Sequence, residues 1–395
     1  MKNFNYLSTE DETATFYKQP ESFNKRTEKE LLAYALGATL YMPATRLTIT
    51  EEIVSGKHLG LSSMVICLED SIGDHEVQLA EDNLILQMST LALSVRNGLL
   101  DVANLPLIFL RVRNPEQVSR IIERLEFKAE LLAGFVFPKF SADSTGQSYW
   151  ELLKHYNNQL TGPVYGMPII ETPRVMNRES RIPELLAIKQ LLNGYSDLVL
   201  NVRIGATDFS GLFGIRRGPD VTIYDIATIN HCIADIINVF ARVESGYVVS
   251  GPVWEYFANG GRLLKPQLRK SPFEEFYGTS GTKVRGQLLN KYIDGLIREV
   301  ILDKENGLVG KTIIHPTHII PVQALYVVSH EEYVDACNIY YNDATQLGVF
   351  KSEYINKMNE IKPHYNWARR IIARSKIYGV FHEHHNFTSL LAEHI

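Results

Sequence analysis

Short apolar runs recur along the chain, and most of them end in polar, proline or glycine residues. Eight runs have strand character, over residues 38–43, 63–70, 105–113, 133–139, 164–171, 197–208, 246–251 and 311–316. Their nearly continuous hydrophobic composition is typical of strands that are buried on both faces. Between most of them, apolar residues recur at helical spacing, which predicts helices within 115–132 and 224–243. Strands and helices therefore alternate.

Eight strand–helix units in one chain predict the α/β class and a (β/α)8 TIM barrel over residues 38–325. A doubly wound open sheet is the alternative, although no GxGxxG sequence follows a strand. Residues 1–37 are expected to form a helical leader, with a helix over 27–37 that covers one end of the barrel. Residues 326–395 are expected to form a C-terminal helical extension, whose first helix begins at a Ser329 cap.

The composition indicates what kind of protein this is and which partners are not expected. The chain has 395 residues, of which 45% are hydrophobic and 22% charged, so a large core is expected rather than disorder. The net charge of −5 and the absence of Lys/Arg runs argue against a nucleic-acid partner. Three dispersed cysteines and a polar, acidic N-terminus without long apolar runs indicate a cytoplasmic protein that is not membrane-bound.

Charged residues stand at the ends of most predicted strands. In a TIM barrel the carboxyl ends of the strands form the active-site face, so these residues are expected to face one another. Each one alone has a simpler explanation, because polar residues at strand ends also cap helices or reach solvent. Along the chain the ring comprises Glu69, Asp70, Arg111, Arg113, Lys139, Glu171, Asp208 and His315.

Seven short motifs in order carry a family resemblance. They are YMPATR (41–46), CLED (67–70), LRVRN (110–114), FPK (137–139), IIET (169–172), GATDF (205–209) and GKTIIHPTHI (310–319). Together they resemble the HpcH/HpaI aldolase and citrate lyase beta-subunit superfamily, in particular its citrate lyase beta-like branch. The resemblance spans about residues 38–325 and implies the same barrel fold.

The resemblance implies a Mg²⁺ site formed by Glu171 and Asp208. In that superfamily the glutamate of the Ile-Glu-Thr motif and the aspartate before phenylalanine bind the ion. The chemistry is consistent, because Mg²⁺ prefers hard oxygen ligands and keeps several waters. Two carboxylates, a bidentate 2-oxo acid and water would complete its shell.

The resemblance also implies the residues that act on the substrate. Arg111 matches the arginine that contacts a substrate carboxylate or the developing oxyanion, with Arg113 as a fallback. Glu69 and Asp70 match an acidic pair near the metal, and either one has the alternative of pairing with a neighbouring cation of the barrel. Arg46 and Thr207, together with Arg111, are the expected substrate-binding residues.

The activity implied is Mg²⁺-dependent cleavage or formation of a carbon–carbon bond. The favoured substrate is a 3-hydroxyacyl-CoA thioester of the citramalyl-, malyl- or citryl-CoA type, with a 2-oxo acid as the other fragment. The alternatives are a class II pyruvate aldolase that acts on a 4-hydroxy-2-oxo acid without CoA, and a barrel that binds a metabolite without catalysis. The resemblance further implies a homo-oligomer, either a trimer or a hexamer.

The chain departs from the family pattern at several points. Its motif reads Gly-Ala-Thr-Asp rather than Gly-Glu-Asp, and no aspartate follows the seventh strand, where Glu255 is the only stand-in. The segment 254–306 is long and basic, which suggests either a phosphate-binding lid or a solvated loop. Lys139 suggests a Schiff-base lysine, but the resemblance makes it a scaffold residue.

Overall fold

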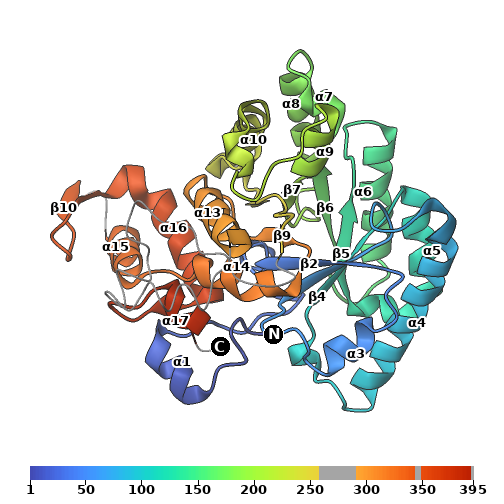
Figure 1. The fold of residues 1–395 in the computed structure, drawn as a ribbon, viewed down its shortest axis with the longest axis horizontal. Coiled ribbons are helices and arrows are strands. Elements are labelled where there is room, and N and C mark those ends of the chain that lie inside the picture. The colour runs from blue at the N-terminus through green and yellow to red at the C-terminus, as the bar shows by residue number, and fades with distance from the viewer. Residues whose placement is uncertain (258–290, 343–347, 393–395) are drawn as a thin grey trace.

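The computed structural model describes residues 1–257, 291–342 and 348–392, and an eight-stranded parallel sheet forms its centre (Figure 1). All eight predicted strands are confirmed. Neighbouring strands follow the order β8-β7-β6-β5-β4-β3-β2-β9, and a parallel bridge between Gly251 and Lys311 joins the two ends of the sheet. The sheet therefore closes into a barrel, and the doubly wound alternative is wrong. The strands are β2 (Ala38–Pro43), β3 (Ser63–Cys67), β4 (Leu107–Arg111), β5 (Leu132–Phe137), β6 (Tyr165–Ile170), β7 (Val202–Ile204), β8 (Val249–Ser250) and β9 (Lys311–Ile313).

Helices surround the barrel and follow its strands along the chain. They are α3 (Ile49–Val54), α4 (Val77–Arg96), α5 (Pro115–Leu125), α6 (Ser144–Asn157), α7 (Pro173–Met176), α8 (Arg181–Asn193), α9 (Ala206–Leu212), α10 (Ala227–Phe240), α13 (Lys291–Glu305) and α14 (Ile319–Tyr326). Helix α5 begins at Pro115, where the Asn114 side chain accepts a hydrogen bond from the Gln117 amide. It ends at Leu125, earlier than predicted, because Glu126 adopts a positive φ of 54° and a 3₁₀ segment follows.

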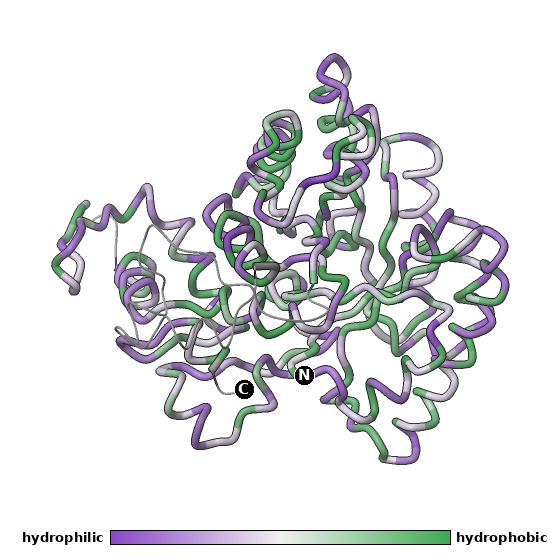
Figure 2. Tube along the Cα trace, viewed as in Figure 1, coloured by the Kyte–Doolittle hydropathy of each residue, from purple (hydrophilic) through white to green (hydrophobic). Residues whose placement is uncertain are grey.

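The barrel strands supply much of the hydrophobic core. Figure 2 shows hydrophobic residues along these strands and along the helices that cover them. Strand β5 lies so close to β6 that a Cβ at Gly134 would be 2.1 Å from the Tyr165 carbonyl oxygen. Within the described residues, no helix is long and apolar enough to cross a membrane.

The C-terminal extension contains strands as well as the predicted helices. Helix α15 (His330–Tyr341) begins at Ser329, and Ser329 and Glu332 form a capping box, as the sequence indicates. Helices α16 (Ile361–Tyr378) and α17 (Phe387–Ala392) follow it. A hairpin of β10 (Val349–Lys351) and β11 (Met358–Glu360), and the short strand β12 (Val380–Phe381), were not predicted. Their few residues leave almost no periodic signal.

The N-terminal segment is less helical than predicted. Helix α1 (Thr9–Thr15) precedes strand β1 (Phe16–Lys18), which pairs with β12. The helix predicted over 27–37 is only one turn long, α2 (Lys29–Leu32). After it the backbone tightens into i→i+3 hydrogen bonds, from the Tyr34 amide to the Leu31 carbonyl and from the Ala35 amide to the Leu32 carbonyl.

Candidate active site

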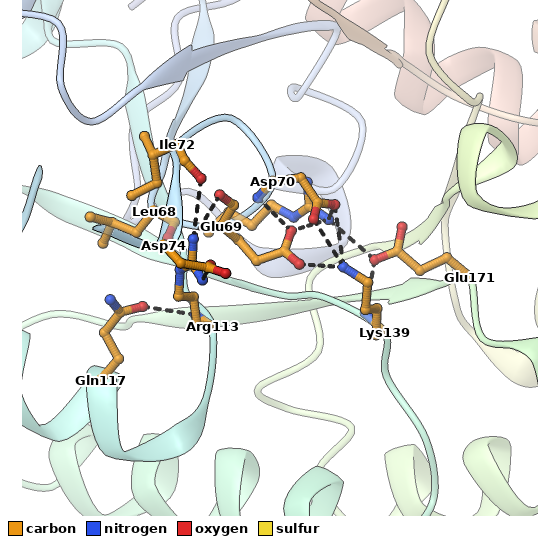
Figure 3. Close-up of polar contacts among 10 residues, drawn as sticks. Leu68, Glu69, Asp70, Ile72, Asp74, Arg113, Gln117, Lys139 and Glu171 are labelled. Carbon is orange, nitrogen blue, oxygen red and sulfur yellow. Dashed lines mark hydrogen bonds and ion pairs between the residues drawn. The ribbon is translucent and has the colours of Figure 1, made fainter. Parts of the chain in front are cut away.

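Four charged residues meet at the carboxyl end of the barrel, each at or just after the end of its strand. Glu69 follows β3, Arg111 ends β4, Lys139 follows β5 and Glu171 follows β6. Neighbouring parallel strands bring these positions together. Figure 3 shows the side chains of Glu69, Lys139 and Glu171 converging, with Asp70 beside them. These five residues, with Asp70 included, are called the Arg111 cluster below.

The guanidinium of Arg111 lies at the centre of this cluster. Its Nη2 is 2.6 Å from Glu69 Oε2, 3.0 Å from Asp70 Oδ2 and 3.3 Å from Glu171 Oε1. Only 8% of Arg111 is exposed, so these carboxylates stabilise its charge in a poorly solvated place. Burial lowers the pKa of Arg111, but Glu171 and Glu69 outweigh that effect and raise it above its usual value. Arg111 is therefore a fixed cation.

Lys139 contributes through both its backbone and its side chain. It has a φ of 47°, which is uncommon for a residue with a Cβ. In this conformation its amide donates to Glu171 Oε1 at 2.8 Å, while its ammonium contacts Glu69 and lies 3.1 Å from Asp70 Oδ1. From sequence, Lys139 is expected to be a scaffold residue. Its position at a strand end was the available signal, but the left-handed backbone was not visible from sequence.

Glu171 is the most deeply buried acid of the cluster, with 4% exposure. Burial raises its pKa to about 8; Arg111 opposes the rise, and the charge of Asp208 adds to it. Asp208 therefore lies near Glu171. Glycine is required at position 205, because a Cβ there would lie 2.0 Å from Glu171 Oε2.

Asp208 lies in the first turn of α9, at the end of β7. The described residues form no group of three or more His, Cys, Asp or Glu side chains arranged to hold a metal. A site of two carboxylates still suits Mg²⁺, which commonly takes one or two from the protein and completes its shell with water and substrate. In the described structure both hydrogen bonds to the Glu171 carboxylate reach Oε1, which leaves Oε2 available. The donor set therefore fits the ion.

Thr207 and Glu255 lie beside this pair. The Thr207 hydroxyl donates to Glu255 Oε1 at 3.0 Å, so the acid suggested as a stand-in after the seventh strand reaches the first turn of α9. Glu255 Oε2 is also 3.5 Å from Arg217 Nε. Much of the long basic segment that follows, 258–290, lies outside the described residues.

Two arginines predicted near the substrate have other partners. Arg46 Nη2 is 2.5 Å from Glu52 Oε1 on α3, so its charge is paired outside the Arg111 cluster. Arg113 Nη1 is 2.6 Å from Asp74 Oδ1, and its Nε donates to the Leu68 carbonyl at 2.7 Å. Arg113 thus holds the loop after β3 in place through these contacts (Figure 3).

His315 also lies at the barrel's carboxyl end, after β9. Its Nδ1 is 2.8 Å from Thr317 Oγ1, and its ring stacks on Phe257 with centroids 4.4 Å apart. Its Nδ1 also accepts a hydrogen bond from the Thr317 amide at 3.4 Å, so His315 caps the following turn. The sequence prediction that His315 orients a neighbour through a hydrogen bond agrees with this contact.

The chain matches one protein family and is similar to several solved structures. The family model described as C–C bond lyase of the TIM-barrel fold matches residues 30–380. The solved structure of CitE from Mycobacterium tuberculosis with magnesium, acetoacetate and coenzyme A is 16% identical, with a TM-score of 0.51 over 87% of this chain and 99% of that chain. The citrate lyase beta subunit from M. tuberculosis, complexed with oxaloacetate and magnesium, is 17% identical, with a TM-score of 0.43 over 74% and 96%. Malate synthase from Haloferax volcanii, as a lead(II) complex, is 11% identical, with a TM-score of 0.47 over 72% and 71%. No curated protein sequence matches the chain significantly.

Proposed function

The chain belongs to the C–C bond lyase family of the TIM-barrel fold, and we propose that it is a Mg²⁺-dependent lyase that cleaves or forms a carbon–carbon bond next to a 2-oxo acid. The observation that carries this proposal is the convergence of Arg111 with Glu69, Asp70 and Glu171 at the carboxyl end of the barrel. That end bears the active sites of TIM-barrel enzymes. A purely structural barrel has no need of a buried arginine held by three acids on this face.

Glu171 and Asp208 are the residues that would hold Mg²⁺. When bound, the ion supplies Lewis-acid polarisation of a carbonyl oxygen and orients the 2-oxo acid. The solved CitE structure with magnesium and acetoacetate supports this choice of cofactor. Lys139 keeps the Glu171 carboxylate in place through its backbone amide, which leaves Oε2 directed elsewhere.

Arg111 is the residue that stabilises charge. Its planar fork suits a carboxylate or an enolate, and its fixed position means that little reorganisation is needed when negative charge develops as the bond breaks. Glu69 and Asp70 orient it from one side, and Lys139 in turn holds both acids. Glu69 and Asp70 thereby act as positioning residues in this proposal. Thr207, which is exposed beside Asp208, is the proposed substrate contact on α9.

The proposed substrate is a 3-hydroxyacyl-CoA thioester, of the citramalyl-, malyl- or citryl-CoA type, that releases a 2-oxo acid. The presence of coenzyme A in the CitE structure of the same fold supports a thioester. A 4-hydroxy-2-oxo acid, cleaved without CoA, is the alternative substrate, because Arg111 and the two metal-binding carboxylates would serve either reaction. The trimer or hexamer and the cytoplasmic location stay predictions.

The test is release of a 2-oxo acid from a panel of 3-hydroxyacyl-CoA thioesters and 4-hydroxy-2-oxo acids, with and without Mg²⁺. Glu171→Gln removes a metal-binding charge and keeps the volume, so we expect a loss of roughly 10³-fold or more in kcat/KM, comparable to the loss of a key electrostatic group. Mg²⁺ affinity, measured by calorimetry, is expected to fall in parallel.

The matched control is Glu179→Gln, the same substitution at an exposed acid eight residues away, which should leave turnover unchanged. Turnover that persists in chelator, or that survives Glu171→Gln, would contradict the metal-dependent mechanism. Mg²⁺ binding without turnover on any substrate of the panel would favour a barrel that binds a metabolite without catalysis.

A further inference from the structure

A cavity lies at the opposite end of the barrel from the Arg111 cluster. Its volume is about 600 Å³, within the size range of small-molecule sites. Its barrel walls come from residues 196–200, 242–248 and 307–309, which precede β7, β8 and β9. Residues within 28–34, around α2, and the extension helices α15 and α16 line its other sides, and the cavity is partly open to solvent. We call it the basal cavity, and it is separate from the candidate active site.

The basal cavity is positively charged, although the whole chain carries −5. Five cationic and three acidic side chains line it, which is a net charge of +2. The cations are Lys29, Arg242, Arg369, Arg370 and Lys376, and the acids are Glu28, Glu30 and Asp197.

Within the described part of the chain, none of the five cations forms a salt bridge with a carboxylate. Lys29 Nζ donates to the Ser196 carbonyl at 2.8 Å, and Arg370 Nη2 donates to the Ala241 carbonyl at 2.6 Å. Both acceptors are neutral, so these two hydrogen bonds leave the charges of Lys29 and Arg370 in place. The side chains of Arg369 and Lys376 make no hydrogen bond with any described residue, and their donors remain available to a ligand.

The arrangement of these donors selects the class of ligand. Arg369, Ala373 and Lys376 lie at helical spacing on one face of α16 and line the cavity together. Guanidinium forks match phosphate oxygens in pairs, and an ammonium adds a point charge. Tyr34 and Tyr247 also line the cavity and offer aromatic surface beside these cations.

We propose that the basal cavity is a binding site for a phosphorylated metabolite of about nucleotide size, with its phosphate held by Arg369, Arg370 and Lys376. The cavity is lined by α15 and α16 of the C-terminal extension, by residues around α2 of the N-terminal segment and by loops of the barrel. Such a ligand therefore bridges these parts of the molecule and stabilises their contact. The ligand binds at the end of the barrel opposite the candidate active site, so it is neither the substrate nor the product of the reaction.

The test is calorimetric titration of the full chain with AMP, ribose 5-phosphate and inorganic phosphate, in a buffer without Mg²⁺. We expect AMP to bind, to raise the melting temperature as its concentration rises, and to bind less well at higher salt. Binding of ribose 5-phosphate or of inorganic phosphate as tight as that of AMP would overturn a ligand of about nucleotide size.

Substitutions of the lining cations test whether AMP binds in the basal cavity. Arg369→Gln should weaken AMP binding roughly tenfold or more, as expected for a lost charge-assisted hydrogen bond, and Lys376→Gln should do the same. Lys362→Gln, at an exposed lysine of α16 that does not line the cavity, is the control and should have no effect. Failure of all three probes to bind at millimolar concentration, or equal binding by wild type and both variants, would overturn the proposal. Loss of AMP binding in Glu171→Gln would instead assign the probe to the active-site end and overturn it too.

Discussion

At the scale of single residues, the candidate site depends on small backbone features as much as on its charged groups. Lys139 places its amide on Glu171 only because its φ is positive, and Gly205 leaves room for the Glu171 carboxylate only because it has no Cβ. Conformations of this kind are found where the surrounding structure enforces them. The sequence motifs FPK and GATDF contain both residues but do not disclose these contacts.

The closeness of Gly205 to Glu171 gives a sharp test of the site. Gly205→Ala would place a methyl group 2.0 Å from Glu171 Oε2, so the carboxylate must move. We expect a fall of at least about 100-fold in kcat/KM, because a displacement of about 1 Å at a catalytic group costs that much. Steady-state kinetics and Mg²⁺ titration of the folded variant measure the effect.

Gly211→Ala is the matched control, in the same short helix α9. A Cβ at Gly211 meets no atom within 4 Å, and alanine is the better helix former by about 1 kcal/mol. This variant should keep full activity and melt at the same or a higher temperature. Equal activity in the two variants would show that the Glu171 position is not critical.

At the scale of elements, a buried group of charges joins the last barrel strand to the helix before it. Lys311 of β9 lies 2.9 Å from Glu299 Oε1 and 2.7 Å from Asp303 Oδ2, both on α13, and all three side chains are fully buried. Glu299 also accepts from the Ile223 amide at 2.8 Å. This group orients α13 on the barrel, although β9 itself has only three residues.

Because of Asp303, the contribution of this buried group of charges to the free energy of unfolding depends on pH. Burial raises its pKa to about 6, with Lys311 opposing the rise and Glu299 adding to it. A carboxyl whose pKa is higher in the folded state retains a proton that the unfolded chain has lost. Its contribution to stability is therefore present below about pH 4 and is lost as pH rises through about 6.

Asp303→Asn removes this titration. The unfolding free energy of the wild type minus that of the variant should fall between pH 4 and pH 6, by at most about 3 kcal/mol, and then level off. Urea unfolding of both proteins at several pH values measures this difference. Glu305→Gln, at an exposed acid of α13, should give a flat difference; a flat or rising difference for Asp303→Asn would contradict the assignment.

At the scale of the whole molecule, the N-terminal segment and the C-terminal extension hold each other against the barrel. Strand β1 pairs antiparallel with β12, and the ring of Phe16 stacks on Phe381 with centroids 6.0 Å apart. The extension also has a small core of its own, formed by Val328, Ala336, Ile339, Ala368, Ile371 and Val380.

Truncation of Phe16 tests this connection. Phe16 is buried, so Phe16→Ala should reduce stability by about 3–5 kcal/mol through lost burial and a cavity. Proteolysis within residues 380–392 should accelerate as β12 detaches. Tyr17→Ala, at the exposed aromatic neighbour, should cost much less in a comparison by thermal unfolding and limited proteolysis. Equal losses in the two variants would argue against the β1–β12 contact.

The hydrophobic pattern of the chain is enough to predict the barrel and the face on which its charged residues gather. A strand buried on both faces leaves a local hydrophobic pattern, and eight such patterns with helices between them leave few other folds. The order of the strands then brings Glu69, Arg111 and Glu171 together, because parallel neighbours share one end. Their roles, and those of Asp208 and Thr207, stay predictions.

The contacts between groups far apart in the sequence become visible in the folded structure. Arg46 pairs with Glu52, Lys139 holds the cluster acids, and Phe16 meets Phe381. The basal cavity likewise arises where segments far apart in sequence pack together. Such contacts depend on loop conformations and on packing between remote parts of the chain, and neither leaves a periodic signal in the sequence.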